Sequence, residues 1–147
     1  MKHIHLLFIS FLMILSLQLA ACAPQEETQE EVKPVSLEPI EGTDLNRLTL
    51  TEKAAERLGL ETAEVSSENV NGVDRIVIPY AALLYDPSGQ AWAYVAIGPL
   101  QYQRQAITVD SIEGGQVILS GGLDAGATVV TLGATELFGS ESEFEEE

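Results

Sequence analysis

The side chains that most often do chemistry in enzymes are scarce in this sequence. Both histidines, His3 and His5, and the one cysteine, Cys22, lie within the first 22 residues. Histidine is the usual general base and metal ligand, and a thiol is a common nucleophile, so residues 23–147 lack both kinds of group. Ser88 and Ser120 stand among turn residues without a partner base. We therefore expect no enzymatic activity and no cofactor.

Carboxylates are the remaining ionisable groups, and two places could gather them. Asp110 and Glu113 could form an acid–base pair, but they border an expected Gly-Gly turn, where carboxylates are usually solvated. The C-terminal sequence ESEFEEE could hold calcium through its oxygen atoms, yet it lacks the spacing of an EF-hand. We expect a solvated acidic tail over residues 140–147 and no metal site.

Aromatic and arginine side chains are better candidates, and the chemistry that they suggest is recognition. Trp92 and Tyr94 are two residues apart on an expected strand, so they share one of its faces. Together with Arg75, Tyr102 and Arg104 they form the set of side chains that we predict could dock a partner. Two alternatives stay open: the rings could stack a sugar, or they could form the half-buried face of a sheet.

The elements that would position these residues are short and mostly β. Residues 48–65 predict a strand, a helix with Thr51 as its N-cap and Gly59 at its end, and a second strand. Asn71-Gly72 predicts a tight turn, and Asp86-Pro87-Ser88-Gly89 fits a type I turn. Further strands are predicted at residues 76–78, 90–97, 100–109, 117–119 and 128–132, with a last turn or short strand over 134–138. This spacing favours a mainly β fold, a small β-sandwich or barrel with one short helix.

Acidic residues concentrate towards the two ends of the chain, whose net charge is −16. Residues 23–44 are rich in Glu, Gln and Pro and poor in apolar groups, which is typical of a flexible segment. We predict a flexible acidic tether over 22–44, a domain over 45–139 and the acidic tail over 140–147. The charge argues against nucleic acid, and against anionic lipid bound through the protein surface.

The first 21 residues have the layout of an export signal. Lys2 precedes an uncharged run over residues 6–20, and Leu19-Ala20-Ala21-Cys22 resembles a bacterial lipobox, in which the signal is cut before a lipid-bearing cysteine. We predict a signal peptide over 1–21 and acyl chains such as palmitate on Cys22, which would anchor the protein on the periplasmic or extracytoplasmic side of a bacterial membrane. An uncleaved membrane anchor is the alternative, and Ala23 after the cysteine leaves the choice of inner or outer membrane open.

Three stretches resemble the C-terminal part of periplasmic adaptor subunits of RND efflux pumps, the membrane fusion protein family. They are IPYAALLYDPSGQAWAYV (78–95), LQYQRQAITV (100–109) and GLDAGATVVTLGATELFGSESEF (122–144). The residues that carry the resemblance are Pro79, Ala81, Ala82, Gly89, Trp92, Val95, Gly122, Leu123, Gly126, Val129, Val130 and Gly133. Residues 48–65 resemble the segment just before the first membrane-proximal strand of such adaptors.

The resemblance implies a non-catalytic membrane-proximal β-domain that docks on an RND-type inner-membrane transporter, a full-length adaptor or both. Only residues 66–75 stand where the family has its outer barrel, lipoyl-like domain and helical hairpin. The resemblance therefore implies an adaptor reduced to its membrane-proximal region, in the service of transmembrane transport. An envelope lipoprotein that binds a ligand, sugar or metal stays open as a function of another class, as does a decaying fragment with no partner.

Overall fold

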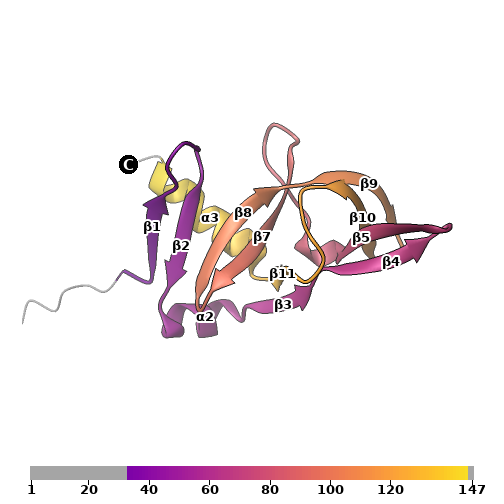
Figure 1. Cartoon of the computed structure of the whole chain (residues 1–147). Helices are drawn as coiled ribbons and strands as arrows, with labels where there is room; N and C mark the ends of the chain where they lie inside the picture. The colour runs from indigo at the N-terminus through magenta and orange to yellow at the C-terminus, as the bar shows by residue number, and fades with distance from the viewer. Residues whose placement is uncertain (1–32, 146–147) are drawn as a thin grey trace, which may run out of the picture. The chain divides into compact units, whose positions relative to one another are not determined.

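Residues 33–145, which a computed structural model describes, form two antiparallel β-sheets and two α-helices (Figure 1). The seven-stranded first sheet has the order β1-β2-β8-β7-β11-β3, with β6 also paired to β7, and the four-stranded second sheet has the order β4-β5-β10-β9. The first sheet consists of β1 (Val35–Pro39), β2 (Asn46–Leu50), β3 (Glu61–Glu64), β6 (Leu84–Tyr85), β7 (Ala91–Gly98), β8 (Gln101–Ala106) and β11 (Thr128–Leu132). The second consists of β4 (Ser66–Val70), β5 (Val73–Pro79), β9 (Thr108–Glu113) and β10 (Gln116–Gly121). The mainly β fold class predicted from the sequence is confirmed.

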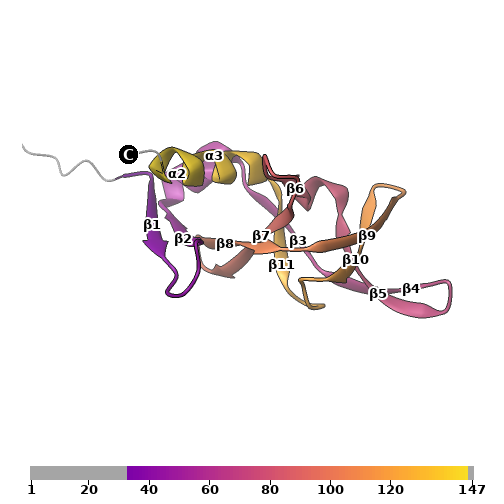
Figure 2. The ribbon, with the colours of Figure 1, turned by 90° about the horizontal axis from the view of Figure 1, so that it is seen from above.

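The helices α2 (Glu52–Leu58) and α3 (Ala134–Glu145) lie on the same side of the first sheet (Figure 2), and a 3₁₀ turn, η2 (Tyr80–Ala82), follows β5. The caps predicted for α2 are confirmed. The Thr51 hydroxyl accepts a hydrogen bond from the Ala54 amide, and Gly59 adopts the left-handed conformation that ends the helix. The second α-helix, α3, was not expected from the sequence.

The first sheet separates two apolar cores because successive residues of a strand point to opposite faces. On β7, Ala91 and Ala93 pack into a core shared with the second sheet, whereas Tyr94 packs under the helices. The core between the sheets also contains Val65, Ile78, Ala82, Ile107, Val117, Leu119, Leu123 and Val129. The core under the helices also contains Val35, Leu48, Leu50, Ala54, Tyr102, Val130, Ala134 and Leu137.

Residues 100–109 do not form the single strand that the sequence predicts. β8 ends at Ala106 in the first sheet and β9 begins at Thr108 in the second. Ile107 between them is 3% exposed, and a Cβ atom on Gly122 would come within 2.6 Å of the Ile107 Cα. The chain thus crosses between sheets at a buried isoleucine, with a glycine beside it because the backbones approach so closely.

The predicted N-terminal boundary of the domain, at residue 45, is also corrected. β1 pairs with β2 along its whole length, and Val35, at 7% exposure, packs with Leu48 and Leu50. Residues 33–44 therefore belong to the folded domain, since ladder hydrogen bonds and one buried valine offset the acidic composition. The predicted signal peptide over 1–21, the lipidated Cys22 and the rest of the predicted tether lie outside the described residues.

At the other end, α3 replaces both the predicted short element at 134–138 and the start of the predicted acidic tail at 140–147. Leu137 and Glu141 are 0% and 1% exposed, and they lie four residues apart on the helix side that faces the first sheet. The acidic composition suggested solvation because it does not distinguish a buried glutamate from exposed ones. Residues 146–147 lie outside the described residues.

Candidate functional site

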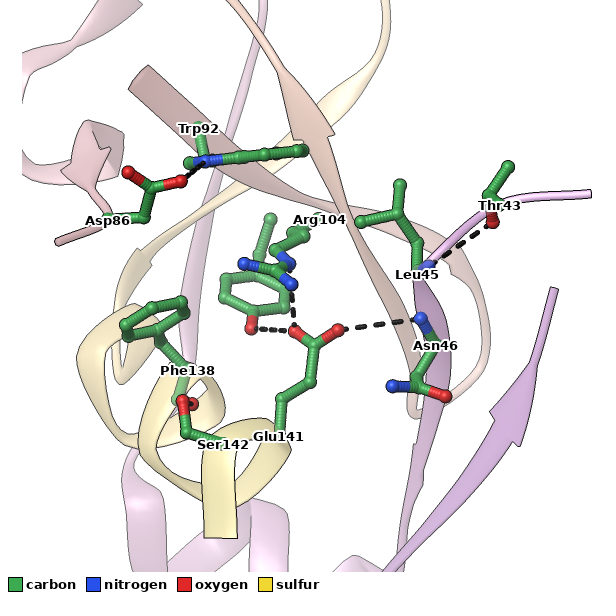
Figure 3. Close-up of polar contacts among 10 residues, drawn as sticks. Thr43, Leu45, Asn46, Asp86, Trp92, Arg104, Phe138, Glu141 and Ser142 are labelled. Carbon is green, nitrogen blue, oxygen red and sulfur yellow. Dashed lines mark hydrogen bonds and ion pairs between the residues drawn. The ribbon is translucent and has the colours of Figure 1, made fainter. Parts of the chain in front are cut away.

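The turn before β7 forms around the carboxylate of Asp86. Its Oδ1 atom accepts hydrogen bonds from the Ser88 amide (2.8 Å), the Ser88 hydroxyl (2.6 Å) and the Gln90 amide (3.0 Å). Its Oδ2 atom accepts one from the Trp92 indole at 3.0 Å (Figure 3). These donors, the Ser88 hydroxyl first and the Trp92 indole second, lower the pKa of Asp86 to about 2. Asp86 therefore fixes both the turn that the sequence predicts and the orientation of Trp92.

Glu141, inside the predicted tail, is the centre of a buried polar cluster (Figure 3). Its Oε2 atom accepts a hydrogen bond from the Tyr94 hydroxyl at 2.5 Å and lies 3.3 Å from the Arg104 Nε atom. Its Oε1 atom accepts a hydrogen bond from the backbone amide of Asn46 at 3.4 Å. The cluster thus connects α3 with β2, β7 and β8, four segments that are distant in the sequence.

The guanidinium of Arg104 lies between two aromatic rings in the same region. Its Cζ atom is 4.8 Å from the centroid of the Trp92 ring and 5.5 Å from that of Phe138 on α3. Both distances are within the range of a cation–π interaction, and the Arg104 side chain is only 13% exposed. The positive charge is therefore used inside the domain, where it holds α3 to the sheet.

Three of the predicted docking residues, Trp92, Tyr94 and Arg104, are thus brought together, although two of them serve the interior. Tyr94 is 0% exposed and Arg104 nearly buried, so neither side chain lies open to a partner or a stacked sugar. Tyr94 and Arg104 instead fit the alternative prediction that these side chains form the covered face of a sheet. Trp92 is half-buried, and its cross-strand partner on β6 is Leu84.

The other two predicted docking residues lie apart from this cluster. Arg75 is half-buried on β5 in the second sheet, opposite Glu68 of β4. Tyr102 is 7% exposed on β8 and packs under the helices opposite Leu48. The five docking residues were predicted from residue type alone, and residue type does not indicate which face of a strand is covered.

A groove that the sequence analysis missed lies along α2 and has a volume of about 570 Å³. One wall is a single helix face, Glu52, Ala55 and Glu56, at the spacing that places side chains side by side. The rest is lined by Gly59, Leu60, Glu61, Leu100 and Tyr102. The i, i+3, i+4 spacing on the predicted helix could have identified the wall, but nothing in the sequence placed Leu100 and Tyr102 opposite it.

Over residues 33–145, no helix is both long enough and apolar enough to cross a membrane. In the same part of the chain, no three His, Cys, Asp or Glu side chains gather as metal ligands would.

No family model and no curated protein matches the chain. Among solved structures, it is similar to an NMR structure of 180 residues that encompasses the N-terminal metal-binding site and the membrane proximal domain of SilB from Cupriavidus metallidurans CH34. The sequences are 24% identical, the match covers 69% of this chain and 66% of that one, and the TM-score is 0.44.

Proposed function

We propose that this chain is a lipid-anchored, non-catalytic adaptor or accessory subunit that acts with an RND-type efflux transporter. In this proposal Cys22 carries the lipid and the domain over 33–145 docks on the periplasmic side of the transporter, on a full-length adaptor, or on both. The proposal rests on the sequence resemblance over residues 78–95, 100–109 and 122–144. The observation that supports it most strongly is the position of those residues in the fold.

Four of the residues that carry the resemblance lie where one element of the domain passes to the next. Pro79 ends β5 before η2, and Gly89, with a φ angle of +85°, closes the turn before β7. Gly122 lies against the crossing between the two sheets, and Gly133 separates β11 from α3. A pattern that places its glycines where the backbone turns or is closely approached supports a shared fold rather than a chance likeness.

A non-catalytic role is part of the proposal because of the residues that are missing. Residues 33–145 contain neither histidine nor cysteine, and Asp86, whose carboxylate has the pKa shifted to about 2, is engaged by the donors of its own turn. Such a strongly ionised carboxylate is a poor general base near neutral pH.

The proposal is tested by photo-crosslinking of the full chain in intact cells, followed by mass spectrometry of what is captured. A photoreactive residue replaces Tyr85 or Leu132, which are 54% and 51% exposed, so that substitution leaves both cores intact. We expect an RND transporter or a full-length adaptor among the captured proteins. Capture of other envelope proteins only, with no pump component, would overturn the docking proposal and favour the ligand-binding lipoprotein.

Anchoring is tested separately with Cys22→Ser. We expect the wild-type chain to incorporate labelled palmitate and to fractionate with membranes, and the variant to lose the label. An equal label on both proteins would contradict lipidation at Cys22 without bearing on the docking partner.

A further inference from the structure

The groove along α2 combines an apolar floor with an acidic rim. Ala55, Leu60 and Leu100 contribute apolar surface, while Glu52, Glu56 and Glu61 contribute carboxylates. The basic residues of α2, Lys53 and Arg57, are one position further along the helix than Glu52 and Glu56, and they do not line the groove. The groove therefore presents carboxylates next to apolar side chains, with no basic group among its lining residues.

Tyr102 adds an observation that is independent of the charge. It is 7% exposed, it lines the groove, and its hydroxyl has no hydrogen-bond partner among the described residues. The hydroxyl is not among the fully buried polar atoms of the described residues, so it reaches the water in the groove and can exchange that water for an acceptor on a bound segment. Burial raises the pKa of Tyr102 above its usual value, so the hydroxyl stays protonated and can donate.

An exposed leucine continues the apolar surface beside the groove. Leu132 of β11 is the cross-strand partner of Glu61 and is 51% exposed. Cross-strand partners point to the same face of a sheet, so Leu132 lies next to a carboxylate of the rim. Leu132 thus extends the apolar surface beside the groove by one exposed side chain.

Two occupants are disfavoured by charge. Residues 23–32, which precede β1, hold four glutamates and no basic residue, so an acidic rim would repel them. The surface of an anionic membrane is excluded from the groove for the same reason.

A small ligand is disfavoured by the shape of the groove. It would be largely left in water, because the groove is open and lacks the enclosure of a ligand pocket.

We propose that this groove binds a segment of a partner protein that carries a lysine or arginine between leucine-like residues. The apolar side chains of the segment pack along Ala55, Leu60 and Leu100, and its basic group lies against the carboxylates of the rim. A backbone carbonyl of the segment accepts a hydrogen bond from the Tyr102 hydroxyl. The inference does not depend on the adaptor proposal, since it concerns the chemistry of the segment and not the protein that supplies it.

The experiment titrates the purified full chain, held in neutral maltoside micelles, with the peptide acetyl-Leu-Lys-Leu-Arg-amide in a calorimeter, with empty micelles as the blank. We expect saturable one-site binding. Glu56→Lys and Glu61→Lys should each weaken it about tenfold, because each reverses a charge that faces the basic group. Tyr102→Phe should weaken it about threefold, the loss of one hydrogen bond to a neutral group.

The matched control is Glu113→Lys, which makes the same change of charge at an exposed position on β9 in the other sheet. We expect it to weaken binding less than about twofold. The proposal is overturned if Glu113→Lys is as harmful as Glu56→Lys, if a peptide with serine for each leucine binds equally well, or if no saturable binding occurs. Self-association of the chain that masks the groove in sedimentation, and that Glu56→Lys abolishes, would overturn it in favour of a second copy. Circular dichroism of each variant confirms that the domain is folded.

Discussion

The two cores of the domain are closed by different physical means. The core between the sheets consists of aliphatic side chains, from Val65, which links β3 to β4, to Val129 on β11. The core under the helices also buries a carboxylate, Glu141, with a tyrosine hydroxyl at 2.5 Å and an arginine at 3.3 Å. Burial of apolar surface is non-directional, whereas a buried ion pair stabilises only the one arrangement that satisfies its partners.

This difference explains why α3 has one position on the sheet. The residues over 134–142 that α3 buries fully are few, chiefly Leu137 and Glu141, so apolar contact alone would fix the helix loosely. Glu141 adds directional contacts to β2, β7 and β8. We infer that the sheet-to-sheet core supplies stability, and that the helix-covered core additionally supplies specificity.

The largest effect that we predict is that of Glu141→Ala. The change leaves Tyr94 and Arg104 buried without the carboxylate, which should lower the free energy of unfolding by about 4 kcal/mol. Trp92, the one tryptophan of the chain, contacts Arg104 and should shift its fluorescence emission as α3 loosens. Urea unfolding monitored by circular dichroism and by this emission measures both effects.

Two matched variants test whether the burial and the charge of the Glu141 carboxylate cause this loss of stability. Glu136→Ala removes the same charge from an exposed position on the same helix and should change stability by less than about 0.5 kcal/mol. Glu141→Gln keeps hydrogen-bonding atoms but not the charge, so it should fall between the two. Equal stability of Glu136→Ala and Glu141→Ala would show that the buried cluster adds nothing to the attachment of α3.

A smaller effect is predicted for Leu119→Ala in the core between the sheets. Leu119 is 2% exposed, and its truncation should lower the free energy of unfolding by about 3 kcal/mol through lost burial and a cavity. Because the residue is on the far side of the first sheet from α3, the native emission of Trp92 should stay unchanged. A shifted emission in the folded variant would mean that the two cores are coupled and that each is not stabilised separately.

The same contrast separates what the sequence predicts from what it does not. Alternation and turn residues predicted the strands around 76–78 and 128–132, and Thr51 and Gly59 predicted the ends of α2, since those signals are local. The buried role of Glu141 depends on Tyr94 and Arg104, 47 and 37 positions away, so an acidic stretch looked like a tail. The switch of sheets at Ile107 was missed because a buried isoleucine continues a strand pattern just as well.

The smallest predicted effect concerns Asp86, whose turn precedes the strand that both cores share. Hydrogen bonds from Ser88 and Trp92 lower the pKa of Asp86 from 3.8 to about 2, so the folded state favours the carboxylate. The stability that these bonds contribute is complete above pH 3.8 and is lost as the pH falls through about 2. Protonation frees the indole from Oδ2, so the emission of Trp92 should change with a midpoint near pH 2.

An acid titration of Trp92 fluorescence in three proteins checks this prediction. Asp86→Asn should abolish the step, and Asp110→Asn, at an exposed position on β9, should leave it in place. If the wild-type midpoint lies near pH 3.8, the turn does not hold the carboxylate as described. If Glu141→Ala also moves the midpoint, the indole transmits changes at α3 to the turn, because Trp92 contacts both Asp86 and Arg104. An unmoved midpoint would show that the turn is set locally, which is the property that made it predictable from four consecutive residues.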